Sequence, residues 1–143
     1  MRYKPVVPLR RFKVYPEGRW LYWNVELYSD LRDMRRAYAI KKRIVNGNTS
    51  DGSRMFGGSG ATGLCLPTTW ISYKTGKART YPSLGTIMFA FPHTGAKVVS
   101  HEVSHAVSSY FQRLRISLDE VGEGERMATV VGEMVGQIIK RIW

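Results

Sequence analysis

Two histidines and a glutamate stand at a spacing that suits hydrolytic metal chemistry. His101 and His105 are four positions apart, and Glu102 directly follows the first. On a helix, residues four apart lie on one face, so both imidazoles can reach one zinc ion at about 2.0–2.1 Å. Glu102 lies about 100° around that helix, where a carboxylate can act as the general base for a zinc-bound water. The motif predicts a Zn²⁺ cofactor, with His101 and His105 as ligands and Glu102 as the catalytic base.

The apolar pattern of the same helix separates these histidines from its expected core face. The apolar residues that centre on the side opposite His101 are Val99, Val103, Ala106, Tyr110 and Leu114. Histidines that are packed in a core would lie within such a stripe. The alternative interpretation is an exposed histidine pair that holds no metal.

A catalytic zinc site takes a third protein ligand besides water. The candidates are His93, Glu120, Glu123, Glu125 and Glu133. On the last expected helix, Glu125 borders Ala128, Gly132 and Gly136, and such small residues would let two helices approach closely. We therefore predict Glu125 as the third ligand. His93 precedes the histidine helix, and we expect either an ordinary loop histidine or an alternative ligand or oxyanion stabiliser.

From residue 89 to residue 143 the chain resembles the gluzincin metallopeptidases, the thermolysin-like branch of the zincins. Their pattern is His-Glu-x-x-His followed by a glutamate ligand on a later helix, and Glu125 stands twenty positions after His105. Thr129 occupies the position where the family often has an Asp that orients a histidine. The resemblance implies a zinc metalloendopeptidase that hydrolyses peptide bonds with a zinc-activated water and takes a protein or peptide as substrate.

The small size and the β-rich run before the histidine helix are also similar to minimal zincin domains, in which an edge strand pairs with extended substrate. The resemblance gives that place to residues 86–91, and it implies that Thr86, Met88 and Ala90 bind the substrate backbone. The chain looks similar in style to small metallopeptidase-like proteins of bacteriophage genomes. The single cysteine favours a reducing compartment, and we expect a cytoplasmic location, the host cytoplasm if the protein is phage-encoded.

A glycine-rich segment at residues 58–63 matches the G-x-G-x-x-G string of dinucleotide-binding proteins. That fingerprint needs a strand before it and a helix after it, because the helix N-terminus meets the pyrophosphate. Here a loop precedes the segment and a β-rich run follows. We therefore expect no nucleotide site in it.

The composition is that of a globular protein. The 143 residues are 43% hydrophobic and 23% charged, which suits a single domain over residues 1–143. Cys65 is the only cysteine, so an intramolecular disulfide and a cysteine-based zinc site are excluded. The sequence has no signal-peptide core and no apolar run of about 18 residues. We expect no membrane partner, and the oligomeric state stays open.

The net charge of +11 is unevenly distributed along the chain. Residues 1–60 hold 13 Lys and Arg against 5 Asp and Glu, a balance of +8. A basic first half suits contact with nucleic acid, and a solvated basic surface is the alternative. The candidate phosphate contacts are Arg35, Arg36, Lys42 and Arg43.

Three aromatic residues beside these charges are candidates for base stacking, although a core role for at least two of them is the simpler expectation. They are Trp20, Tyr22 and Trp23. Two alternative functions follow from these features. One is a basic nucleic-acid-associated module with a structural or vestigial zinc site, and the other is a virion or assembly protein in which zinc only joins two helices.

The elements that must position the motif follow from turn residues and periodicity. We expect a hairpin at 12–26 that turns at 16–18, a helix after Ser29 and Asp30, a loop at 46–63, β-rich runs at 64–73 and 86–91 separated by a basic turn at 74–79, a helix at 96–114 and a last helix after 122. This order predicts an α+β fold. We expect a small zincin-like domain, in which a mixed or antiparallel sheet packs on the histidine helix and the C-terminal helix.

Overall fold

The computed structural model describes residues 5–18, 20–46, 62–67, 71–74, 77–80, 82–117 and 122–143. Its strands are β1 (Arg10–Val14), β2 (Tyr22–Tyr28), β3 (Gly63–Pro67), β4 (Ile71–Lys74), β5 (Lys77–Thr80) and β6 (Ser83–Ala90). Its helices are α1 (Leu31–Asn46), α3 (Ala96–Arg113) and α4 (Glu123–Ile142). The predicted α+β class is confirmed at this level.

Four strands form a mixed sheet in the order β1-β2-β6-β3. The β1–β2 and β3–β6 pairs are antiparallel, whereas β2 and β6 run parallel. Strands β4 and β5 form a separate antiparallel pair. The expected basic turn at 74–79 is therefore partly strand, because β5 begins at Lys77. The expected β-rich run at 64–73 contains parts of two strands, β3 and β4.

The predicted hairpin at the start of the chain is confirmed. In β1, Phe12 and Val14 are buried while the residues between and before them are exposed, as expected of a strand with one covered face. The turn contains Gly18 at φ +67°, a left-handed conformation that glycine adopts without the steric cost of a side chain. The hairpin places β2 in the interior of the sheet.

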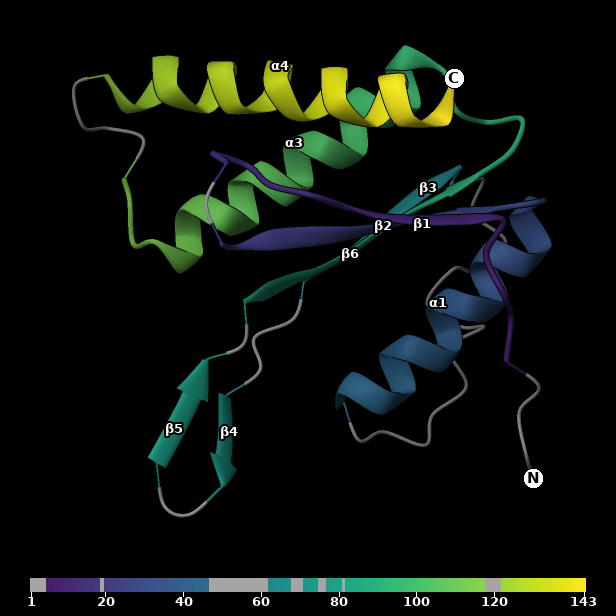
Figure 1. Cartoon of the computed structure of the whole chain (residues 1–143), viewed down its shortest axis with the longest axis horizontal. Coiled ribbons are helices and arrows are strands. Elements are labelled where there is room, and N and C mark those ends of the chain that lie inside the picture. Colours follow the sequence, from purple (N-terminus) through teal and green to yellow (C-terminus); the bar gives the residue numbers. More distant parts are fainter. Residues whose placement is uncertain are drawn as a thin grey trace.

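The helix α1 begins where its cap predicts. The Asp33 backbone N–H donates to Asp30 Oδ1 at 2.8 Å, which satisfies one of the free donors at the helix start. Met34, Ala37 and Tyr38 are buried in a cluster with Met88 of β6. The helix thus covers one face of the sheet (Figure 1).

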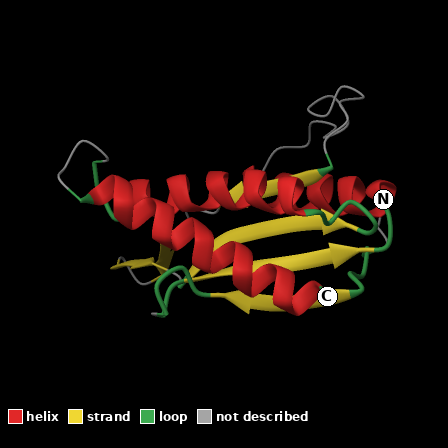
Figure 2. Cartoon of the chain, turned by 90° about the horizontal axis from the view of Figure 1, so that it is seen from above, coloured by secondary structure: helices red, strands yellow, loops and turns green. Residues whose placement is uncertain are grey.

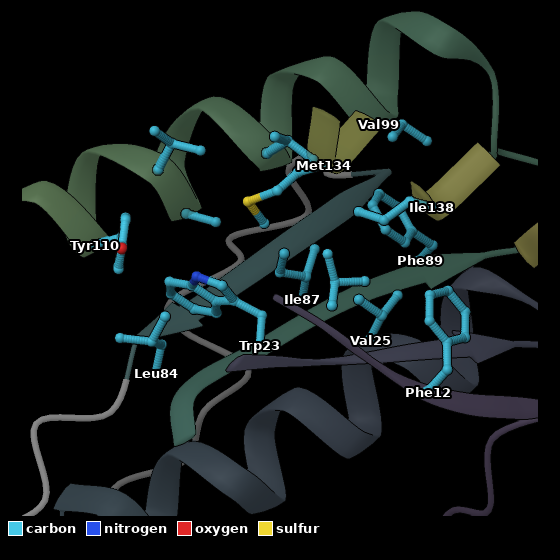
Figure 3. Packing of buried hydrophobic residues seen from close by; sticks show 14 of the residues in the cluster. Phe12, Trp23, Val25, Leu84, Ile87, Phe89, Val99, Tyr110, Met134 and Ile138 are labelled. Carbon is cyan, nitrogen blue, oxygen red and sulfur yellow. The ribbon is translucent and has the colours of Figure 1, made fainter. Parts of the chain in front are cut away.

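The opposite face of the sheet packs on α3 and α4, and the larger hydrophobic cluster lies there. Trp23, Ile87 and Phe89 contribute from the strands, and the helices contribute Val99 and Met134 (Figure 3). The domain has three layers, with the sheet in the middle. Within the described residues, no helix is long and apolar enough to cross a membrane.

The helix α4 lies at an angle to α3 over the same face of the sheet (Figure 2). Four apolar residues at four-residue spacing hold it on the core: Val130, Met134, Ile138 and Ile142. At its end, Arg10 Nη1 donates to the backbone carbonyl of Arg141 at 2.7 Å. A side chain from β1 thereby satisfies a carbonyl that the helix leaves unpaired.

Candidate metal and hydrolytic site

The helix α3 presents the two histidines to solvent, as the sequence predicts. Val99, Val103 and Ala106 are fully buried against the sheet. The His101 side chain is 68% exposed, and His105 is exposed as well. The histidines are therefore not part of the hydrophobic core, so their position on α3 is not explained by packing.

The two imidazoles converge on one point. Nε2 of His105 lies 3.2 Å from Nε2 of His101, and the rings stand almost perpendicular, at 81°. Two nitrogens that each lie about 2.0–2.1 Å from a tetrahedral zinc ion are about 3.3 Å apart. The same spacing also allows one imidazole N–H to donate to the other ring. The donor pair therefore fits zinc in chemistry and separation.

Glu102 lies between the histidine pair and the interior of the domain. Only 6% of Glu102 is exposed, and its Oε1 is 3.9 Å from Nε2 of His101. Burial raises the pKa of the Glu102 carboxyl, and His101 and His105 act in the opposite direction. A carboxyl with a raised pKa is a better proton acceptor near neutral pH than an ordinary surface glutamate.

The strand β3 comes close to α3 at this point. A Cβ atom on Gly63 would lie 2.8 Å from Cγ of Glu102 and 3.0 Å from Cγ1 of Val98. No larger residue fits there without displacing these side chains. Gly63 was the last glycine of the G-x-G-x-x-G string, whose other glycines lie outside the described residues. In the structure Gly63 serves the approach of a strand to the glutamate.

A groove of about 590 Å³ runs between β3 and α3 and includes two of the motif residues. Its lining residues are Gly63, Leu64, Cys65, Pro67, Glu102, His105, Ser108, Ser109 and Gln112. The strand β3 is the last strand of the four-stranded sheet, so the groove follows a sheet edge. The motif thus opens onto a space that can hold an extended ligand.

The predicted substrate strand is wrong. Thr86, Met88 and Ala90 belong to β6, which lies between β2 and β3 in the sheet and is not an edge. All three residues are buried, Met88 and Ala90 completely. The backbone of β6 pairs with a strand on each side, so it has no free edge for a substrate. The edge position next to the motif belongs to β3.

The structure does not bring Glu125 to the histidines. Glu125 is exposed in the first turn of α4. The next residue, Arg126, is the one that connects this turn to α3: it donates to Glu17 Oε1 at 2.6 Å, and Tyr110 near the end of α3 donates to the same oxygen. The expected close approach through small residues is wrong, because a Cβ atom on Gly132 would meet no atom within 4 Å. Within the described residues, no three His, Cys, Asp or Glu side chains form a group that could hold a metal.

The other candidate ligands are also apart from the pair. His93 is exposed in the loop between β6 and α3, and its backbone N–H donates to the carbonyl of Ala90 at 2.7 Å. Glu123 forms an ion pair with Arg126 at 3.4 Å, Glu133 is exposed on α4, and Glu120 lies outside the described residues. Thr129 Oγ1 donates to the carbonyl of Glu125, so it does not orient a histidine.

Several groove residues were not found from the sequence. Ser108 and Gln112 follow His105 at three and seven positions, so their place on the histidine side of α3 was available from helix phase. Cys65 was considered only for its redox and metal chemistry, and its position opposite Glu102 depends on the pairing of β3 with β6. Burial, and then the Glu102 carboxylate, raise the pKa of the Cys65 thiol to about 12.

Comparisons of the chain with protein-family models, with curated proteins and with solved structures find no match. The chemical meaning of the site therefore depends on the residues themselves. These residues offer two convergent imidazoles, a buried carboxylate and an adjoining groove on a sheet edge.

Proposed function

We propose that the protein is a zinc-dependent hydrolase of peptide bonds, with His101 and His105 as metal ligands and Glu102 as the general base. The 3.2 Å separation of the two Nε2 atoms carries the proposal, because it matches the separation of two ligands on one tetrahedral ion. The resemblance to the zincins supports it in the His-Glu-x-x-His motif. The position of α3 beside the edge strand β3 is a second feature shared with minimal zincin domains, in which an edge strand pairs with the substrate.

Zinc, when bound, supplies Lewis acidity that activates water and polarises the carbonyl of the substrate. The residues of the chain would do the rest. His101 and His105 hold the ion as neutral imidazoles. Glu102 takes a proton from the attacking water on its carboxylate and delivers it to the leaving nitrogen as the C–N bond breaks. The third protein ligand is not assigned, since the described residues form no three-membered ligand group.

The groove suits an extended peptide. A peptide that adds to the outer edge of β3 would form main-chain hydrogen bonds with the strand, and its side chains would alternate between α3 and solvent. Ser108, Ser109 and Gln112 would then line the wall that faces the substrate. The open position of the histidine pair, beside this groove, favours a catalytic site over a closed structural one, in which four protein ligands surround the metal.

The test combines zinc titration with peptidase assays on a quenched-fluorescence peptide library. We expect about one zinc per chain, loss of tight zinc binding in His105→Ala, and retained zinc in Glu102→Gln with activity reduced by about 10²–10⁴-fold, because only the proton acceptor is removed. Purified protein that binds no added zinc, or a Glu102→Gln variant with wild-type cleavage, contradicts the proposal.

Glu125→Gln is the matched control, since it makes the same chemical change on an exposed residue outside the pair. We expect it to bind zinc as the wild type does. A large loss of zinc affinity in this variant would instead restore Glu125 as the third ligand, as the family resemblance implies.

A further inference from the structure

The helix α1 covers only part of its face of the sheet. The helix lies over the half that holds the C-terminal ends of β2 and β6 (Figure 1). In the other half, Lys13 and Tyr15 are exposed and Tyr22 and Asn24 are half-buried. None of these four side chains belongs to the hydrophobic cluster that α1 forms with the sheet.

Strand register shows that these side chains share one face. Lys13 is the partner of Asn24, and the next pair along the ladder is Val14 with Trp23. Val14 and Trp23 are buried in the cluster beneath α3 and α4. Because successive side chains alternate between the two faces of a sheet, Lys13 and Asn24 point to the opposite face, away from the zinc motif.

The aromatic rings on this face form a surface for stacking. The centroids of Tyr15 and Tyr22 are 5.9 Å apart at an interplanar angle of 59°, and Nζ of Lys13 lies 4.4 Å from the centroid of Tyr22. Trp20, in the connection between the strands, is 62% exposed. Of the three aromatic residues that the sequence proposed for stacking, only Trp23 lies in the core, so the expectation that at least two would do so is wrong.

The charge of the same face is positive. Arg11 and Lys41 both contact the Glu26 carboxylate, at 2.7 and 3.4 Å, and Lys13 lies two residues beyond Arg11 on β1. Two cationic side chains therefore contact one buried carboxylate, and Lys13 is a third cation on the same face. The net charge of this group is +2, and the cations are the part that solvent reaches.

We propose that this face, defined by Arg11, Lys13, Tyr15 and Tyr22, binds single-stranded nucleic acid. Exposed rings accept unpaired bases by stacking, and the cations beside them neutralise phosphates. A duplex presents no free base faces to such rings, so single strands fit better. The site differs from the sequence-based expectation, which placed the phosphate contacts on Arg35, Arg36, Lys42 and Arg43 of α1.

The experiment is a fluorescence anisotropy titration of the full chain with a labelled 20-nucleotide single strand, in DNA and RNA forms, at several salt concentrations. We expect Tyr22→Ala to weaken binding roughly fivefold or more and Tyr22→Phe to bind as the wild type, because the phenyl ring retains the stacking surface. Lys13→Gln should reduce the slope of log affinity against log salt by about 1.

Two exposed residues, Lys140 near the end of α4 and Trp143 directly after it, provide matched controls. Lys140→Gln removes one charge and Trp143→Ala one exposed aromatic ring away from this face, and both should bind as the wild type does. Circular dichroism checks the fold of every variant, and Lys13→Gln at an exposed site still tests the idea if Tyr22→Ala does not fold. Absent binding at low salt, or a Lys140→Gln effect as large as that of Lys13→Gln, overturns the proposal. Zinc binding is measured separately, so the two proposals succeed or fail independently.

Discussion

Two buried glutamates on opposite faces of the sheet have contrasting surroundings. Glu26, 1% exposed, accepts from Arg11 Nε at 2.7 Å and from the Tyr28 hydroxyl at 3.0 Å, and Lys41 lies 3.4 Å away. For Glu102, the basic side chain within 4 Å in the described part of the chain is that of His101, with Nε2 3.9 Å from Oε1. One carboxylate is neutralised by its surroundings, while the other retains a raised pKa.

The difference lies in the partners of the two carboxylates: Glu26 contacts cations and a hydroxyl donor, whereas Glu102 is the residue that we propose as the general base. A buried carboxylate that contacts two cations and a hydroxyl donor is compensated for its loss of solvent. A buried carboxylate without such partners destabilises the fold when ionised. A general base must accept protons, which would account for keeping Glu102 despite this cost. Three experiments test the comparison.

Glu26→Gln should have the largest effect on stability. Removing this carboxylate leaves Arg11 and Lys41 without their partner, and we expect a loss of about 2 kcal/mol in the free energy of unfolding. That is below the usual cost of breaking a buried pair, because both cations are partly exposed. Denaturant unfolding measures it. Glu102→Gln serves as the counterpart and should be at least as stable as the wild type in the absence of metal; an equal loss in both would remove the distinction.

Gly63→Ala should have an intermediate effect. The added methyl group would lie 2.8 Å from Glu102 Cγ, so either β3 or the glutamate must move. We expect a loss of about 1–3 kcal/mol, as is usual for overpacked sites. Gly132→Ala on α4 is the control, since its methyl group meets no atom within 4 Å and should stabilise the helix by up to about 1 kcal/mol. A neutral Gly63→Ala would show that Glu102 is not held by this contact.

The smallest effect should appear in the alkylation of Cys65. Because burial and the Glu102 carboxylate raise its thiol pKa to about 12, the thiolate is scarce at pH 8, and the iodoacetamide rate should keep rising up to pH 10. In Glu102→Gln the profile should shift to lower pH, since the carboxylate contribution is gone while burial remains. Unfolded protein in denaturant gives the reference rate. A folded wild-type profile that levels off near pH 9 contradicts the assignment.

The histidine pair could be predicted from the sequence because helix phase is local. The positions of Val99 and Val103 alone indicate that His101 faces outward. The burial of Glu102 could not be predicted, because it depends on Gly63, which is nearly forty residues earlier in the chain. The assignment of Glu125 failed for a related reason: small residues on α4 permit a close approach but do not require one, and Met134 and Ile138 decide which side of α4 packs.

The helices and strands could be predicted equally well from the sequence. The order of the strands in the sheet could not. The hairpin, the Asp30 cap and the last two helices follow from turn residues and apolar periodicity within short windows. The error about β6 arose because its place in the sheet depends on a parallel pairing with β2 across residues 29–82. Patterns of alternation cannot show which strands become neighbours, and an almost wholly buried strand such as β6 is compatible with several positions.

This parallel pair also has a consequence for how the protein is made. The sheet cannot form its central pair until the ribosome has released residue 90, because β6 lies between β2 and β3. Until then α1 has no β6 residue, such as Met88, to cover its apolar side. Pairings between distant segments slow folding and prolong such exposure. We expect the nascent chain to depend on chaperone protection over this interval, and the histidine helix α3 emerges only after the sheet that supports it.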